Sequence, residues 1–269
     1  MCMLIGQNNI LNKINSIDSL DLLPKTNIIL GNKGMGKHTL LKYICNKFEV
    51  ELKNIDFELS TDILNDMYAL SYPIFYVIDI ENLGKNKRIE RFQNTLLKFV
   101  EEPPEFAWIF ILCNNKFNIL DTLENRCQVL KLEPYSIIEL QQIAALNDKQ
   151  YSDSDLAILN TPYNIINSNS SQLQKIFSLC NNIVDNINKA TISNTLSIRN
   201  KLDSDLIIYL FIQILSKVLY EKYIHTSLNE HKYLEAYMLT INLMSNINIL
   251  NINKNNLIDK FLLDLKDIL

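Results

Sequence analysis

A glycine-rich stretch near the N-terminus has the residue types and spacing of a phosphate-binding loop. Residues 31–39 read GNKGMGKHT and match the pattern G-x-x-x-x-G-K-[ST] everywhere except at its last position. The glycines let the backbone turn its N–H groups toward an anion, the start of a following helix adds its dipole, and the lysine would reach the β- and γ-phosphates. The alternative is a glycine-rich turn that binds nothing. The predicted nucleotide-binding residues here are Gly31, Gly34, Gly36, Lys37, His38 and Thr39.

The departure from the pattern concerns the metal that accompanies a nucleotide. His38 stands where a Ser or Thr hydroxyl would hold Mg²⁺, and Thr39 lies about 100° further round a helix, so it cannot simply take over. We therefore expect a nucleotide as the cofactor, in a pocket whose Mg²⁺ chemistry is weakened. The five cysteines are scattered with no C-x-x-C pair, which excludes the usual structural zinc spacing. No metal-binding residues are predicted.

Two polar residues follow apolar runs. Asp79 ends the run Ile74–Asp79, which is typical of a buried parallel strand that brings a carboxylate to its C-terminal edge. Asn114 follows the run 107–112 in the same way. The alternatives are an acid that closes a strand near solvent and an asparagine that serves a turn.

The elements that position these residues alternate along the first half of the chain. Apolar runs predict strands at 26–30, 74–79, 107–112 and 127–132, and helical spacing predicts helices at 4–20, 39–48, 60–70 and 88–102. Strands that alternate with helices over about 130 residues predict an α/β fold with a doubly wound parallel sheet.

From residue 136 onward the strand signals stop. Ser136 and Glu139 form a capping box that opens a helix, and further helices are expected at 153–159, 170–187, 203–223, 232–245 and 255–269. We predict a nucleotide-binding α/β domain at 1–135, a helical lid domain at 136–198 and a helical collar domain at 199–269. The collar is expected to drive oligomerisation, because its apolar faces exceed what so small a domain can bury: Leu206, Ile207, Leu210, Phe211, Ile214, Leu215, Leu262, Leu263 and Leu265.

Composition limits the classes of function. The net charge of −4 argues against a general nucleic-acid coat, so any DNA contact must be local. The N-terminus lacks the pattern of a signal peptide. The longest apolar run, 206–215, is about half a membrane span. We expect a cytoplasmic protein with no membrane partner.

The most specific stretch is QNTLLKFVEEPP at 93–104. It resembles the sequence that follows the second nucleotide-binding motif in clamp-loader subunits of the AAA+ superfamily. The resemblance continues through ILCNN at 111–115 and LENRC at 123–127, where the family has Ser-Arg-Cys, and it covers about residues 5–135. The remainder agrees in architecture only. Within the family, the chain is similar to the δ′ (delta prime) subunits of bacterial DNA polymerase III and to phage or replication-factor-C-like small subunits.

The resemblance implies roles for the acidic and polar candidates. Asp79 would orient the metal, and Asn114 would sense the γ-phosphate. The family usually has the catalytic Glu directly after the Asp, whereas here Ile80 intervenes and Glu81 lies one residue too far along. A second sensor arginine is expected near 168–173, where no basic residue stands. ATP hydrolysis by the chain itself is therefore expected to be impaired.

The resemblance also implies that Arg126 is an arginine finger that acts in trans on a neighbouring subunit. A guanidinium is always charged and can fork onto two phosphate oxygens. The alternative is an ion pair with Glu124 or Glu133 at the rim of the sheet.

Four basic residues lie at the start of the helix after Asp79, in the region that lines the DNA chamber of clamp loaders. There they would contact phosphates without reading sequence; the alternative is a solvated basic turn. These predicted DNA-binding residues are Lys85, Lys87, Arg88 and Arg91.

Together these features predict a clamp-loader subunit that helps load a sliding clamp onto primed DNA in a hetero-oligomer with other clamp-loader subunits. It would act as a stator-like subunit: it would have little or no ATPase activity of its own and would complete the ATPase site of a neighbouring subunit. The alternatives are a self-sufficient AAA+ NTPase that acts as a homo-oligomer, and a structural scaffold with an empty pocket.

Overall fold

The computed structural model describes residues 4–55, 61–80, 88–226, 231–247 and 253–269, with the backbone alone at 61–64, 88–92 and 117. The chain divides into two compact units. The first contains residues 1–143 with Thr161–Tyr163, and the second contains Ala144–Asn160 with Asn164–Leu269.

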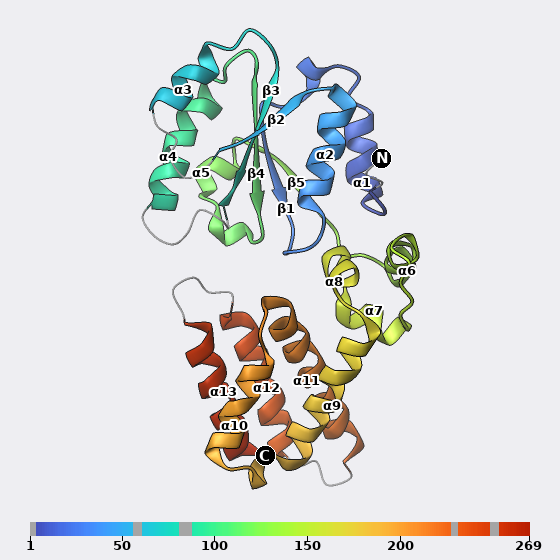
Figure 1. The fold of residues 1–269 in the computed structure, drawn as a ribbon. Helices are drawn as coiled ribbons and strands as arrows, with labels where there is room; N and C mark the ends of the chain where they lie inside the picture. Colours follow the sequence, from blue (N-terminus) through green and yellow to red (C-terminus); the bar gives the residue numbers. More distant parts are fainter. Residues whose placement is uncertain (1–3, 56–60, 81–87, 227–230, 248–252) are drawn as a thin grey trace. The chain divides into compact units, whose positions relative to one another are not determined.

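The first unit is built on a five-stranded sheet in the order β2-β3-β4-β1-β5, and every neighbouring pair is parallel (Figure 1). The α/β fold with a parallel sheet is therefore confirmed. Strand β2 was not predicted, because this short edge strand has mixed composition, no buried side chain and therefore no apolar run. The strands are β1 (Thr26–Leu30), β2 (Glu51–Asn54), β3 (Ile74–Asp79), β4 (Ala107–Cys113) and β5 (Gln128–Lys131).

Strand β4 shows how the sequence divides the core between two faces of the sheet. All seven of its residues are buried, because β4 lies between β1 and β3 and both of its faces are covered. Trp108, Phe110 and Leu112 join one apolar cluster, whereas the alternate residues Ile109 and Ile111 join the other.

Helices cover both faces of the sheet (Figure 1). Buried side chains of α1 and α2 belong to one cluster, and those of α3, α4 and α5 belong to the other. Helix α1 is shorter than predicted and is followed by a separate 3₁₀ turn, η1. These elements are α1 (Asn8–Asn15), η1 (Leu20–Leu22), α2 (Lys37–Phe48), α3 (Thr61–Tyr68), α4 (Arg88–Glu101), η3 (Lys116–Asn118) and α5 (Asp121–Glu124).

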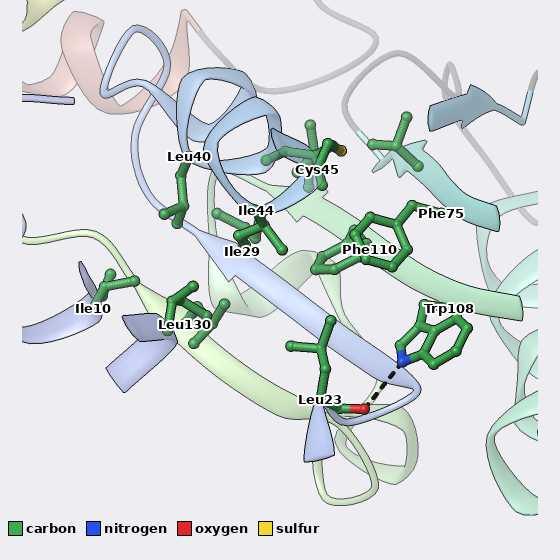
Figure 2. Close-up of a cluster of buried hydrophobic side chains, with 14 of the residues drawn as sticks. Ile10, Leu23, Ile29, Leu40, Ile44, Cys45, Phe75, Trp108, Phe110 and Leu130 are labelled. Carbon is green, nitrogen blue, oxygen red and sulfur yellow. Dashed lines mark hydrogen bonds between the residues drawn. The ribbon is translucent and has the colours of Figure 1, made fainter. Parts of the chain in front are cut away.

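The cluster on the α1/α2 face contains the largest buried side chain, Trp108. Its indole Nε1 donates a hydrogen bond to the carbonyl of Leu23 at 3.0 Å, as Figure 2 shows. Phe75 packs edge-on against the Trp108 ring at a centroid distance of 5.9 Å and lies 5.1 Å from the ring of Phe110. The indole N–H is thus satisfied within an otherwise apolar cluster.

Two helices cross the division between the units, α6 (Ile137–Leu146) and α8 (Pro162–Asn167). The predicted capping box opens α6: the Ser136 amide donates to Glu139 Oε2 at 2.7 Å, and the Glu139 amide donates to Ser136 Oγ at 3.3 Å. Helix α8 was not predicted, although the proline at its first position is a recognised signal for the start of a helix.

The second unit is helical. Helix α11 packs against both α9 and α12, and α13 packs against α12 and α10. Of these helices only α10 was not predicted; it is short and mostly polar. The elements are α7 (Asp153–Leu159), α9 (Ser170–Asn186), η4 (Ile187–Lys189), α10 (Ile192–Ser197), η5 (Ile198–Lys201), α11 (Asp205–His225), α12 (His231–Asn246) and α13 (Lys254–Ile268).

The burial of the last helices corrects the argument made for the collar. Leu210, Phe211, Ile214 and Leu215 are at most 1% exposed within the chain itself. Leu262 and Leu265 are fully buried, and Leu206, Ile207 and Leu263 are half-buried. The helical unit does bury most of these side chains, so they do not form a free apolar face for assembly. The boundaries of the three predicted domains, and the oligomerising role of the last one, stay predictions.

Within the described part of the chain, no helix combines the length and the apolar character needed to cross a membrane.

Candidate nucleotide-binding site

The candidate site lies at the carboxyl edge of the sheet, where three neighbouring strands end. Leu30 of β1 is in register with Cys113 of β4, and the amide of Gly31 donates to the Cys113 carbonyl at 3.1 Å. Asp79, at the end of β3, is in register with Leu112 on the other side of β4. The strand order therefore brings the glycine loop, Asn114 and Asp79 to one edge, which is where ligands bind in open parallel sheets.

The loop has the backbone conformation that its glycines predict. Gly34 and Gly36 both have positive φ angles, of 87° and 91°. Gly36 forms the N-cap of α2, which starts at Lys37. Alternating positive and negative φ values near a helix N-terminus turn successive N–H groups toward one side, the arrangement that suits an anion.

Lys37 is buried, at 7% exposed, and its ammonium group is held by three acceptors. The Nζ atom donates to the carbonyl of Gly31 at 2.7 Å, to the carbonyl of Asn32 at 3.2 Å and to Oδ1 of Asn114 at 2.5 Å. Lys37 and Asn114, 77 positions apart in the sequence, are therefore brought together as the resemblance implied.

Two further side chains that sequence analysis did not select support the loop. The hydroxyl of Tyr135 donates to the carbonyl of Met35 at 3.0 Å, and burial raises the pKa of this phenol, which keeps it protonated as a donor. The amide of Tyr163, at the start of α8, donates to the carbonyl of Gly34 at 3.2 Å. Tyr135 directly follows Pro134, and Tyr163 directly follows Pro162, but neither pattern indicates a partner so distant in sequence.

The positions that decide metal and water chemistry differ from what hydrolysis requires. The His38 side chain is exposed, and Thr39 is half-buried. Ile80 is 2% exposed and packs into the core cluster on the α3/α4 face, so its side chain does not line the site. Asp79 is half-buried at the end of its strand.

Arg126 lies at the opposite edge of the sheet from the glycine loop. It precedes β5, whose first residue, Gln128, is in register with Asn27 near the start of β1. Gly31 follows Asn27 by four positions along β1, a distance of about 13 Å at roughly 3.3 Å per residue. The amino edge that holds Arg126 is thus well removed from Lys37 of the same chain.

The Arg126 side chain makes two contacts there. Its Nη1 donates to the carbonyl of Thr122 at 2.9 Å, and its Nη2 lies 3.5 Å from Oε1 of Glu101, the last residue of α4. The ion-pair partner is therefore Glu101; the two alternatives named from the sequence, Glu124 and Glu133, are not the residues that hold it. Glu124 instead pairs with Lys116 at 3.0 Å.

The remaining predicted residues cannot be placed in the site. Glu81, Lys85 and Lys87 lie outside the described residues. Arg88 and Arg91 lie in the first turns of α4, where only the backbone is described. Their proposed contacts with DNA stay predictions.

Gln93, the first residue of the stretch QNTLLKFVEEPP, ties α4 to the connection that follows β4. This side chain is 2% exposed. Its Nε2 donates to the carbonyl of Asn118 at 2.8 Å, and its Oε1 accepts from the amide of Leu120 at 2.7 Å. The amide thus fixes α4 to the connection that leaves the end of β4, beyond Asn114.

Comparisons with known proteins support the sequence-based resemblance. Residues 46–136 match the family model described as DNA polymerase III, delta subunit. The matched stretch begins near the end of α2, after the glycine loop, and it includes both the Glu-Glu-Pro-Pro and the Arg-Cys motifs. No curated protein sequence gives a significant match.

The chain also aligns with solved structures at low identity. One is the RuvB Holliday junction branch migration motor of Thermotoga maritima, at 17% identity and a TM-score of 0.45. Two variants of Thermotoga maritima RuvB, at 17% and 18% identity, have TM-scores of 0.47. Each alignment covers 82% of this chain and 76% of the other.

The family match falls on the motifs that carry the resemblance, in a parallel α/β sheet followed by helices. Over residues 46–136 the chain is therefore clamp-loader-like, and its predicted resemblance to AAA+ clamp-loader subunits is confirmed.

Proposed function

We propose that this chain is a clamp-loader subunit in DNA replication that helps open a ring-shaped sliding clamp and place it on primed DNA. The match of residues 46–136 to a DNA polymerase III delta-subunit family supports this role. The proposed partners are other clamp-loader subunits, the sliding clamp and primed DNA, and such a role would place the chain in the cytoplasm.

Nucleotide binding is part of the proposal, and the residues of the site fit a phosphate chain. Gly34 and Gly36 supply the turned backbone, and Lys37 supplies a buried positive charge next to Asn114. ATP, when bound, would supply a phosphoryl group whose oxygens face these donors. Lys37 would then exchange a carbonyl partner for a phosphate oxygen, which offers a stronger, charge-assisted hydrogen bond.

We further propose that the chain hydrolyses ATP slowly or not at all. His38 is an exposed imidazole where a hydroxyl would hold Mg²⁺, a cation that prefers oxygen ligands. Ile80, in the position where the resemblance implies the water-polarising acid, is apolar and directed into the core. Both observations support a site that binds a nucleotide but lacks two parts needed for its cleavage.

The single observation that carries the stator-like role is the separation of Arg126 from the glycine loop of its own chain. Arg126 lies at the amino edge of the sheet and Lys37 at the carboxyl edge. A side chain that is 45% exposed and remote from its own loop is available to a neighbouring subunit. A guanidinium in that position could stabilise charge on the phosphoryl group that the neighbour transfers.

The isolated chain provides the first test. Titrated with a fluorescent ATP analogue, it is expected to bind the nucleotide but to show no turnover above background. Robust turnover by the purified chain alone would instead support a self-sufficient NTPase, and no binding at all would support a structural scaffold.

The complex provides the second test, with partner subunits identified by co-purification from the native host. Arg126→Ala should leave folding and assembly intact, since exposed ion pairs contribute little to stability. It should lower the clamp- and DNA-stimulated ATPase activity of the complex by about 10-fold. This is less than the roughly 10³–10⁵ measured for arginine fingers, because several sites share the work. Arg126→Lys should rescue poorly, because an ammonium cannot fork onto two oxygens.

The matched control is Lys116→Ala. It removes another surface cation, whose side chain is 60% exposed and pairs with Glu124. That variant should retain the activity of the complex. Equal losses from Lys116→Ala and Arg126→Ala would point to a general effect of surface charge and would contradict the proposed finger.

A further inference from the structure

The two most specific motifs of the sequence meet at the Arg126 side chain. Glu101, which ends α4, is the first acid of the Glu-Glu-Pro-Pro motif, and Arg126 belongs to the Arg-Cys motif 25 positions later. The Nη2 atom of Arg126 lies 3.5 Å from Oε1 of Glu101. The resemblance assigns the finger role to the arginine but gives no role to this acid.

Of the two contacts of Arg126, the one with Glu101 is weak and the one with Thr122 is a well-formed hydrogen bond. The hydrogen bond from Nη1 to the Thr122 carbonyl is 2.9 Å long, an ordinary length. The separation of 3.5 Å from Glu101 exceeds the roughly 2.7–2.9 Å of a strong charge-assisted hydrogen bond. The Arg126 and Glu101 side chains are 45% and 56% exposed, so water competes for both.

A phosphate and the Glu101 carboxylate would compete for the same group. Both are anions that bind the outer edge of a guanidinium, and a phosphate that forks onto it requires two N–H donors. One Nη1 donor already bonds the Thr122 carbonyl, and the Nη2 group faces Glu101. An incoming phosphate therefore meets an attractive guanidinium with a repulsive carboxylate directly beside it.

We propose that Glu101 is the counter-ion that Arg126 exchanges for a phosphoryl group of the neighbouring subunit's nucleotide. Glu101 is thus a positioning residue: it holds the guanidinium against the ends of α4 and α5 until a stronger anion takes it. The Thr122 carbonyl keeps the arginine anchored through the exchange. This inference rests on the proposed trans role of Arg126 and assigns a function to the first acid of the Glu-Glu-Pro-Pro motif.

The direction of the effect distinguishes a counter-ion from a structural support. Glu101→Gln keeps the size of the side chain and an acceptor oxygen but removes the charge. If Glu101 competes with phosphate, the substitution raises the stimulated ATPase activity of the complex. The expected gain is up to about 5-fold, which corresponds to the roughly 1 kcal/mol that is the upper end for an exposed ion pair.

Glu102→Gln is the matched control. Glu102 carries the same charge at the next position and is exposed, and its backbone carbonyl accepts a hydrogen bond from the Tyr68 hydroxyl at 2.6 Å, which the substitution leaves intact. A general effect of negative charge on this surface would appear in both variants. A specific exchange at Arg126 appears only in Glu101→Gln.

The experiment is a double-mutant cycle in the reconstituted complex. Stimulated ATPase activity is measured against ATP concentration for the unmodified complex, Glu101→Gln, Glu102→Gln, Arg126→Ala, and the Glu101→Gln/Arg126→Ala pair. We expect Glu101→Gln to raise kcat, Glu102→Gln to leave it unchanged, and Glu101→Gln to have no effect once Arg126 is absent. The gain in ATPase activity from Glu101→Gln should become smaller as the salt concentration rises. Salt screens the exposed ion pair between Glu101 and Arg126, which is the pair that the substitution removes.

Two failures can be told apart. If Arg126→Ala lowers activity while Glu101→Gln leaves it unchanged or lowers it, the counter-ion inference is overturned and the proposed function stands. If Arg126→Ala has no effect on the complex, the trans role itself fails, and the inference fails with it.

Discussion

The ammonium group of Lys37 lies 2.5 Å from Oδ1 of Asn114, and this contact ties the glycine loop after β1 to the end of β4. Lys37 also donates to two carbonyls of the loop itself. In this conformation the lysine therefore supports the loop as well as presenting a positive charge to a nucleotide.

Lys37→Ala is expected to remove nucleotide binding and to lower the free energy of unfolding by about 2 kcal/mol, because a charged donor with three partners is lost. Urea denaturation and titration with a fluorescent ATP analogue measure the two effects. Lys42→Ala, at an exposed position of the same helix α2, is the control and should change neither. A Lys37 variant of unchanged stability would contradict the supporting role.

Gly34 and Gly36 share a positive φ but differ in their surroundings. A Cβ added at Gly34 would lie 2.8 Å from Tyr163 Cβ and 3.0 Å from Thr161 Oγ1, whereas one added at Gly36 would meet nothing closer than 3.5 Å. Both alanine substitutions should lower the free energy of unfolding by about 1–2 kcal/mol, because a residue with a Cβ is strained in the left-handed backbone conformation. Gly34→Ala should lose more, because the start of α8 must also move. Equal losses in thermal or chemical denaturation would show that the contact with Tyr163 is unimportant.

Restoring a catalytic acid at position 80 should not restore hydrolysis. Ile80 is 2% exposed within an apolar cluster, so Ile80→Glu would bury a carboxyl group and remove core contacts. We expect Ile80→Glu to lower the free energy of unfolding by about 3 kcal/mol or more. Ile80→Val, the control, should cost about 0.5–1.5 kcal/mol. If Ile80→Glu together with His38→Ser yields a stable chain that turns over ATP, the inward orientation of residue 80 is not what limits catalysis.

Gln93→Ala should lower the free energy of unfolding by about 2 kcal/mol, because it removes a buried side chain that makes two part-buried hydrogen bonds, to the carbonyl of Asn118 and from the amide of Leu120. Asn94→Ala, one position along α4 and exposed, should have almost no effect. Denaturation midpoints compare the two. Hydrogen exchange at the Leu120 amide should become faster in Gln93→Ala alone, and unchanged protection there would contradict the role given to Gln93.

The helical unit allows stability and assembly to be separated by mutation. Phe211 is 1% exposed, so Phe211→Ala should lower the free energy of unfolding by about 3–5 kcal/mol. Tyr220, on the same helix α11, is 49% exposed, and its ring lies 5.6 Å from the ring of Tyr237, so Tyr220→Ala should lower the free energy of unfolding by only about 0.5–1.5 kcal/mol. Light scattering with the partner subunits then tests assembly. Any loss of assembly in the stable Tyr220 variant would identify an exposed surface of α11 as the contact.

The sequence by itself determined the elements whose signals are local. Strand β4 follows from a continuous apolar run that is buried on both faces, and the glycine loop follows from three glycines between a strand and a helix. Alternation with a period of two and helical spacing are properties of neighbouring residues, so they can be read without knowledge of the fold. The same holds for the capping box of Ser136 and Glu139.

The tertiary structure decided which distant residues meet. The strand order set Lys37 against Asn114 and placed Arg126 at the opposite edge, where it pairs with Glu101. Glu124 pairs with Lys116 instead. Tyr135 and Tyr163 reach the loop from positions a hundred or more residues later in the chain.

Burial was decided in the same way. The apolar residues of α11 indicate a helix, but only their packing against α9 and α12 showed that the chain covers them itself. In the sequence, Ile80 is an apolar residue between two acids, and nothing local shows which way its side chain points. The packing of the sheet places it in the core. Local periodicity fixes which face of an element is apolar, whereas the partner of that face depends on how parallel strands and their crossover helices are ordered in space.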